Sequence, residues 1–159
     1  MEAMLETTSE LRVRYAETDQ MGLVYHTNYL VWCEIGRTDW LRQAGARYAD
    51  LERQGIYLAL SGARIRFLAA ASYDDPIRVR TRLTRVRSRD VRFSYVVEHA
   101  ETMQPLVRAE TDLICLDASG SPRQLPSELD ELLRRATDGS APTGTTGRLQ
   151  GVANTNARR

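Results

Sequence analysis

The chain has 159 residues, of which 42% are hydrophobic and 27% charged, as expected for one globular domain that can bury a core. A formal net charge of +1 gives no overall field favouring nucleic acid or a membrane surface, and no apolar run reaches membrane-span length. Cys33 and Cys115 lack the spacing of metal ligands or of a disulfide framework. The acidic N-terminus has no apolar signal region. We therefore expect a cytoplasmic protein without a metal site.

The chain begins with a short strand and a polar turn. Residues 11–16 alternate between apolar and polar side chains, which predicts a half-buried strand with Tyr15 on the same face as Leu11. Residues 19–22, Asp-Gln-Met-Gly, then form a turn. An acid and a glycine are thus placed immediately before the next element.

A long helix is predicted from about Asn28 to Ala44. Thr27 or Asn28 is a suitable N-terminal cap, and Gly45 is a suitable C-terminal cap. The first half of the helix is apolar on almost every side, which is typical of a buried helix. Gly36 lowers helix stability by about 1 kcal/mol relative to alanine, so we expect another element to approach the backbone closely there.

The second half of the chain has the two-residue period of β-strands. After a short helix or loop at 46–55, four antiparallel strands are expected. The third ends at a turn near residue 104, and a final short helix starts at Ser127. The predicted strands cover residues 56–70 with a break at 61–62, 77–86 with a bulge at 84–85, 91–97, and 106–116 in a central position.

These elements predict an α+β fold, in which a curved antiparallel sheet wraps around one long central helix. The domain is expected to span residues 8–136, and the polar, small-residue segment 137–159 is expected to be a disordered tail. The sheet covers one side of the helix and has free edges. Pairing with a second copy would cover both, so we expect a homodimer.

The residues from Tyr15 to Tyr29 carry a family resemblance. They contain the pattern Asp-x-x-Gly-x-Val-x-His-x-x-Tyr, followed by Trp32 and Glu34 on the helix. This stretch closely resembles the hotdog-fold acyl-CoA thioesterases of the 4-hydroxybenzoyl-CoA thioesterase family. It is most similar to the broader bacterial branch, which has a histidine before the helix where the narrower branch has a tyrosine.

The resemblance implies a division of roles among the motif residues. The catalytic carboxylate of the family falls on Asp19, the turn glycine on Gly22, and the backbone N–H that polarises the thioester carbonyl on His26. Basic residues near the turn between the second and third of the four strands hold the CoA phosphates in that family, and Arg87 and Arg89 match them best. The family forms dimers, often paired into tetramers, with active sites at the subunit interface.

The chemistry of thioester hydrolysis is compatible with these residues. A helix N-terminus supplies N–H groups for the oxyanion. Asp19 can attack the carbonyl as a nucleophile or activate water as a general base, and the His26 side chain can contact Asp19 or water. Asp19 can also be a mere turn residue, as its place in the turn allows. Tyr25, Tyr29 and Trp32 are candidates for core or acyl-pocket positions.

The predicted activity is hydrolysis of short-chain aliphatic or aromatic acyl-CoA to free acid and CoA, without a cofactor. Two alternatives stay open: a thioesterase for acyl carrier protein, and a non-catalytic acyl-CoA-binding module on the same fold. A dehydratase of similar fold needs a histidine and acid spacing that this motif does not resemble.

Overall fold

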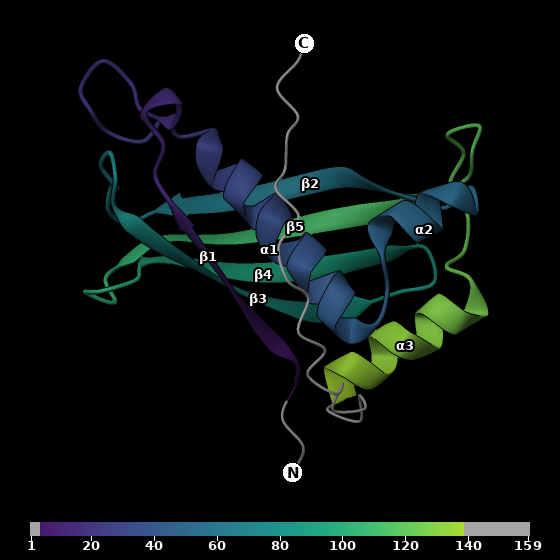
Figure 1. Ribbon diagram of the computed structural model, residues 1–159. Helices are drawn as coiled ribbons and strands as arrows, with labels where there is room; N and C mark the ends of the chain where they lie inside the picture. Colours follow the sequence, from purple (N-terminus) through teal and green to yellow (C-terminus); the bar gives the residue numbers. More distant parts are fainter. Residues whose placement is uncertain (1–3, 139–159) are drawn as a thin grey trace.

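The computed structural model describes residues 4–138 (Figure 1). It contains five strands, three α-helices and one 3-10 turn in these residues. In chain order they are β1 (Glu6–Arg12), η1 (Tyr15–Glu17), α1 (Asn28–Ala44), α2 (Tyr48–Arg53), β2 (Tyr57–Phe67), β3 (Pro76–Val86), β4 (Asp90–His99), β5 (Pro105–Leu116) and α3 (Ser127–Asp138).

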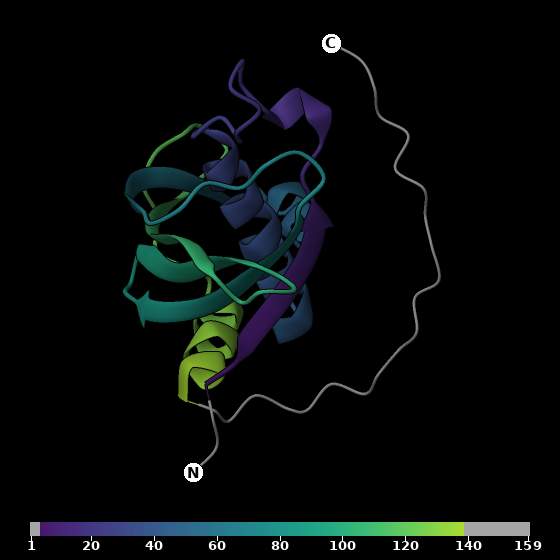
Figure 2. The same ribbon diagram turned by 90° about the vertical axis from the view of Figure 1, so that its left-hand side faces the viewer.

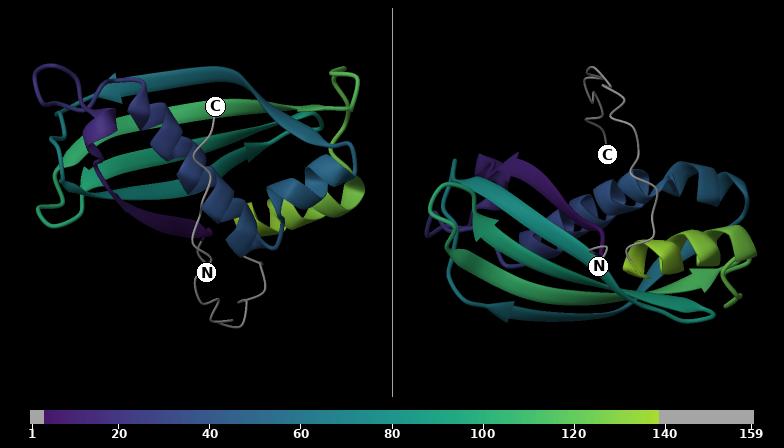
Figure 3. Two further views of the ribbon diagram at one scale, coloured as in Figure 1. Left: turned by 45° about the horizontal axis from the view of Figure 1, so that its top comes forward. Right: turned by 90° about the horizontal axis from the view of Figure 1, so that it is seen from below.

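The strands form one antiparallel sheet in the order β1-β3-β4-β5-β2. The sheet curves around α1, which lies across its concave face (Figures 1 and 3). The predicted α+β fold, with a curved sheet wrapped around one long helix, is therefore confirmed. β5 is central, as predicted, and β1 and β2 are the two edge strands.

Two predicted irregularities of the sheet are confirmed. The β2–β5 register shifts between Leu60 and Gly62, and the β3–β4 register shifts between Leu83 and Arg85. A bulge changes which face the following side chains point to, so each strand keeps its apolar residues toward α1 on both sides of the shift.

Gly36 explains how α1 approaches the sheet. A Cβ atom at Gly36 would lie 2.4 Å from Oγ1 of Thr81 and 2.9 Å from Cγ1 of Val79, both on β3. These distances are closer than real Cβ contacts, so only glycine fits. The expected close approach is present, and it offsets the lower helix propensity of glycine.

The first strand differs from its prediction. β1 covers residues 6–12, earlier in the chain than the predicted 11–16, and Tyr15 begins a 3-10 turn in which its side chain is 78% exposed. The buried carboxylate of Glu17 accepts a hydrogen bond from the Arg14 backbone N–H at 2.8 Å. That bond closes a tight turn where alternation alone predicted extended backbone.

Two other expectations need adjustment. α1 is not buried on all sides in the single chain, because Val31 is 45% and Ile35 40% exposed. α3 includes Thr137 and Asp138, so it runs past the expected domain boundary at 136. The rest of the predicted disordered tail lies outside the described residues. No described helix is long and apolar enough to cross a membrane.

The two ends of the sheet are covered differently. At one end α3 packs beside the C-terminus of α1 and beside β3 (Figures 1 and 2). At the other end lies the turn formed by residues 17–25, called the site turn below. The site turn is attached to the β2–β3 connection, because Val24 N–H donates to Ala71 O at 2.9 Å and Leu23 pairs with Ser72.

Candidate active site

The site turn is a tight hairpin in which Asp19 is the first residue of the turn. Asp19 N–H donates to Leu23 O at 2.7 Å, and Gly22 has a positive φ of 78°, which glycine adopts without strain. Oδ1 of Asp19 accepts the N–H groups of Met21 at 2.8 Å and Leu23 at 3.2 Å. The carboxylate is therefore held in a fixed orientation by its own turn. Its Oδ2 atom has no hydrogen-bond partner within residues 4–138.

Glu17 connects the site turn to α1. Its side chain accepts hydrogen bonds from the Arg14 backbone N–H and from Nε1 of Trp32, both at 2.8 Å, and it is only 4% exposed. Burial opposes ionisation of Glu17, but these hydrogen bonds outweigh it, so the pKa of Glu17 is lowered. Its carbonyl oxygen also accepts from Tyr25 N–H at 2.8 Å and Asn28 Nδ2 at 3.0 Å.

No role for Glu17 was predicted from the sequence. A signal was available: an acid two residues before the motif aspartate, with a tryptophan on the following helix. Interpreting it required the three-dimensional contact between Glu17 and Trp32, which lie fifteen positions apart.

The N-terminus of α1 has no side-chain cap. Thr27 occupies the cap position without a side-chain hydrogen bond to the helix, and the Asn28 amide donates back to Glu17 O and Tyr25 O. The capping expected from Thr27 or Asn28 is therefore wrong, because the Asn28 side chain is used to hold the site turn. The backbone N–H groups of His26 and Thr27 have no acceptor among the described residues.

His26 is exposed and lies among aromatic rings. Its ring centroid is 4.4 Å from that of Tyr25 and 6.4 Å from that of Phe67, at the end of β2. Phe67, which is 53% exposed, also contacts Tyr29 edge-on at 5.9 Å. Phe67 was not predicted as a site residue, because only the fold brings the end of β2 to His26.

Tyr29 and Trp32 are core residues in the single chain, 2% and 1% exposed. The Tyr29 hydroxyl accepts the Ala71 N–H at 3.1 Å, and burial raises the pKa of Tyr29. The indole of Trp32 is bonded to Glu17. Both rings are therefore buried in the core, whereas the side chain of Tyr25 is 48% exposed and lies at the surface. A role for these three rings in binding substrate stays a prediction.

Arg87 and Arg89 lie far from Asp19 within one chain. They occupy the exposed β3–β4 turn, whose backbone is bonded to β5 and to the segment before α3. That turn lies at the opposite end of β3 from the site turn, and β3 has eleven residues, an extended length of about 35 Å along the strand. A role for these arginines in holding the CoA phosphates stays a prediction.

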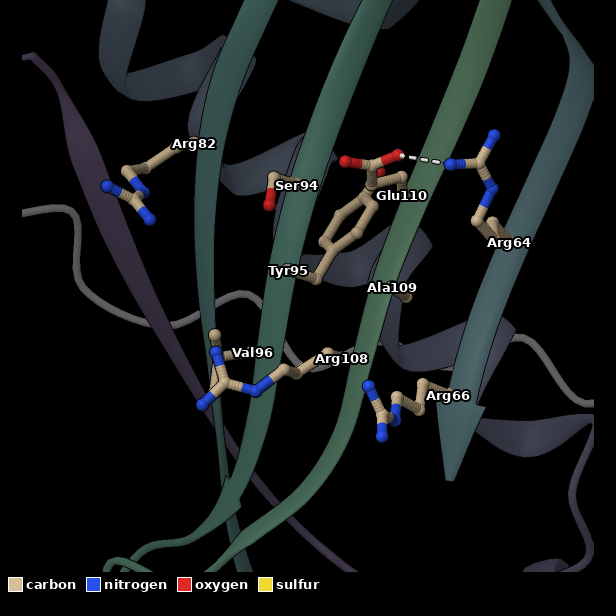
Figure 4. Close-up of a pocket in the computed structure, with 9 residues that line it drawn as sticks. All are labelled: Arg64, Arg66, Arg82, Ser94, Tyr95, Val96, Arg108, Ala109 and Glu110. Carbon is tan, nitrogen blue, oxygen red and sulfur yellow. Dashed lines mark ion pairs between the residues drawn. The ribbon is translucent and has the colours of Figure 1, made fainter. Parts of the chain in front are cut away.

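An open hollow of about 300 Å³ lies on the outer face of the sheet, away from α1 (Figure 4). None of the predicted site residues lines it. Within residues 4–138 no group of three or more His, Cys, Asp or Glu side chains could hold a metal ion. The candidate active site is therefore the exposed surface formed by Asp19 and the start of α1.

The fold and the site turn together define a class of protein, the hotdog-fold thioesterases. The model of the thioesterase-like superfamily matches residues 13–135, and the chain belongs to that superfamily.

Individual relatives agree with this assignment. A putative acyl-CoA thioesterase of Bacillus subtilis, YneP, is 34% identical over 68% of this chain and 78% of its own length. A chloroplastic acyl-acyl carrier protein thioesterase of Arabidopsis thaliana, ATL3, is 28% identical over 76% of this chain and 63% of its own. The structure of a DHNA-CoA thioesterase from Staphylococcus aureus has a TM-score of 0.81 and 27% identity, and the match covers 85% of this chain and 93% of that one.

Proposed function

We infer that this chain is a thioester hydrolase that cleaves acyl-CoA into a free acid and CoA. The single observation that carries the mechanism is the uncapped start of α1, where two N–H groups lack acceptors in the described residues, and which follows a few positions after Asp19, whose carboxylate is fixed by its own turn. An acyl-transfer site needs that combination of a hydrogen-bond donor for an oxyanion and a group that delivers oxygen. The acyl-CoA thioesterases among the relatives support the same reaction.

The proposed reaction places the thioester carbonyl oxygen at the His26 N–H. With Asp19 as general base, water loses a proton to Oδ2 and its oxygen bonds to the carbonyl carbon, forming an oxyanion. The C–S bond then breaks, the acid forms, and CoA leaves as a thiolate. With Asp19 as nucleophile, Oδ2 bonds to the carbon, the thiolate leaves, and water cleaves the mixed anhydride. The free Oδ2 atom fits both routes.

A homodimer is part of the proposal. The outer side of α1 exposes Val31 and Ile35, and the free edge strand β2 exposes Leu60; pairing with a second copy would cover these side chains and the strand edge. Antiparallel pairing of two β2 edges would set the site turn of one chain beside the opposite end of its partner's sheet. That end carries Arg87 and Arg89, which makes a phosphate role for them possible in the dimer.

The dimer is tested by sedimentation equilibrium on the full chain. We expect twice the chain mass of 18.0 kDa, or four times that mass if dimers pair into tetramers. A monomer at concentrations where the enzyme is active would contradict the proposal. The cytoplasmic location stays a prediction, for which the two buried free cysteines are the support.

An acyl carrier thioester is the second candidate substrate. The similarity to the Arabidopsis acyl-acyl carrier protein thioesterase supports it. Both substrates present the same thioester, so the reaction at Asp19 would not differ. The carrier would have to dock around the site turn, where Met21 and Tyr15 are among the most exposed apolar side chains.

A substrate panel read by thiol release tests the function. Short, long and aromatic acyl-CoA thioesters are compared with the same acyl groups on a carrier protein. We expect hydrolysis of at least one CoA thioester. Hydrolysis of carrier thioesters alone would move the assignment to the second candidate. No hydrolysis of any substrate, with acyl-CoA binding retained, would indicate a binding module.

A further inference from the structure

The outer face of the sheet carries a regular pattern of charge. Arginines at alternate strand positions point away from α1, and most of them are paired with a carboxylate on a neighbouring strand. The pairs, given with N···O distances, are Arg64–Glu110 at 3.7 Å, Arg78–Glu10 at 3.6 Å, Arg80–Glu98 at 3.2 Å, Arg82–Glu6 at 3.4 Å and Arg92–Asp112 at 2.7 Å.

Arg66 and Arg108 are the exceptions to this pattern. They lie directly opposite each other in the β2–β5 register, and both are exposed. Neither forms an ion pair with a carboxylate among the described residues. Like charges directly opposite in a sheet are destabilising. Arg85 and Arg92 are also directly opposite each other, but both are paired with Asp112. The repulsion between Arg66 and Arg108, in contrast, is uncompensated among the described residues.

The unpaired arginines line the open hollow of about 300 Å³ (Figure 4). Arg64 and Arg82 also line it, so four guanidinium groups surround the same space. Glu110 is the only acid in its lining, and Figure 4 shows it joined to Arg64 on the side away from Arg66 and Arg108. The hollow therefore has an excess of positive charge that the protein itself does not neutralise.

We propose that this hollow is an anion site for a multiply charged phosphate group, held by Arg66 and Arg108. Guanidinium groups form paired hydrogen bonds to phosphate oxygens, and an anion bridging the two would turn their repulsion into attraction. Four of the nine residues that line the hollow are arginines, which favours an anion over a neutral acyl chain. The site lies on the opposite face of the sheet from the acyl-transfer site, so it does not depend on the proposed hydrolysis.

Pyrophosphate binding tests the proposal. Isothermal titration calorimetry at low ionic strength compares the wild-type protein with the double variant Arg66→Gln/Arg108→Gln. The matched control is Arg47→Gln/Arg53→Gln, which removes the same charge from exposed arginines that lie outside the hollow and have no proposed phosphate role. We expect the first variant to weaken binding by at least about tenfold and the control to change it much less. Equal affinity in all three proteins, or no binding to wild type, would overturn the site.

Thermal unfolding gives a second readout that separates the site from a folding defect. Without anion, the Arg66→Gln/Arg108→Gln protein should melt no lower than wild type, since the substitutions remove a repulsion. Pyrophosphate should raise the melting temperature of wild type and of the control, but not that of the double variant. An equal rise in all three would assign the stabilisation to other charges and contradict the proposal.

Competition identifies the source of the phosphate. CoA carries a pyrophosphate and a further phosphate on its nucleotide, whereas pantetheine carries none. Displacement of pyrophosphate by CoA but not by pantetheine would assign the site to the nucleotide of CoA. Retention of pyrophosphate against CoA would assign it to a separate phosphorylated ligand. Both readings require Arg66 and Arg108, and neither depends on whether the chain hydrolyses thioesters.

Discussion

The two ends of α1 contrast in how their backbone groups are satisfied. At the C-terminus, Gly45 adopts the left-handed conformation with φ 103°, and Gly45 and Ala46 donate to Arg42 O and Leu41 O. α3 covers this end through Leu132. At the N-terminus no side chain caps the helix, and N–H groups lack acceptors in the described chain.

The difference supports the proposal that the N-terminal end has the chemical function. A helix end without a cap loses about 1 kcal/mol of stability, and this cost is tolerated where a ligand supplies the missing acceptor. The Asp19 carboxylate is held by the site turn and forms no ion pair among the described residues, so it stays available for reaction. A capped C-terminus keeps α1 in place, and free N–H donors at its N-terminus are what an acyl-transfer site on this fold requires.

The largest effect is expected from Asp19→Asn. The Asn side-chain oxygen can still accept the N–H groups of Met21 and Leu23, so the turn and the melting temperature should be nearly unchanged. The amide cannot accept a proton or attack the carbonyl, and kcat should fall by about 100- to 10,000-fold. The rate of thiol release from an acyl-CoA substrate measures this fall in kcat. Wild-type turnover in this variant would reduce Asp19 to a turn residue.

Glu17→Gln should affect both activity and stability. An amide oxygen can accept only in place of one carboxylate oxygen, so either the Arg14 N–H or the Trp32 indole loses its acceptor. We expect a loss of about 1–3 kcal/mol in unfolding free energy. A fall in kcat of about tenfold or more with little change in KM would indicate that Glu17 positions Asp19 relative to α1. Unchanged kcat would limit Glu17 to a structural role.

The lowered pKa of Glu17 predicts that the free energy of unfolding decreases at acid pH. The pKa of Glu17 is lowered in the folded state from its ordinary value of 4.5. The stability it contributes is therefore fully present above about pH 4.5 and is lost as the pH falls through the lower, folded-state pKa. Denaturant unfolding at several acid pH values should show a steeper loss for wild type than for Glu17→Gln. Identical slopes would contradict this assignment.

Gly36→Ala supplies a control of matched stability. The new Cβ would meet Thr81 and Val79, so overpacking of about 1–3 kcal/mol should exceed the gain of about 1 kcal/mol in helix propensity. Because Gly36 lies in the middle of α1, kcat should change far less than in Glu17→Gln at a temperature where both are folded. Equal losses of kcat would mean that destabilisation alone explains the Glu17 effect.

The smallest effect is expected from Gly45→Ala, at the completed end of α1. Alanine at φ 103° is strained, and a loss of about 1 kcal/mol should appear as a lower melting temperature. Activity should not change, because this end faces α3. A clear fall in kcat would show that the two ends are coupled and would weaken the contrast between them.

Much of the fold follows from the sequence because its signals are local. α1 has the predicted bounds, and Gly36 has the expected close neighbour. Both register shifts lie where the alternating apolar residues change between even and odd sequence positions. The prediction that the chain starts with a strand at 11–16 was wrong, since alternation cannot detect that the side chain of Glu17 is captured by a tryptophan on the next helix.

The motif from Asp19 to Tyr29 was sufficient, on sequence alone, to indicate the family, because turn residues, a glycine and a helix start are specified by neighbours along the chain, whereas the catalytic roles of its residues stay predictions. Only the tertiary structure decided that Glu17 joins the turn to α1, that Phe67 meets His26, that Arg87 lies at the far end of the sheet, and that Arg66 faces Arg108. Those relations depend on strand register and helix packing, which bring together residues that no local pattern connects.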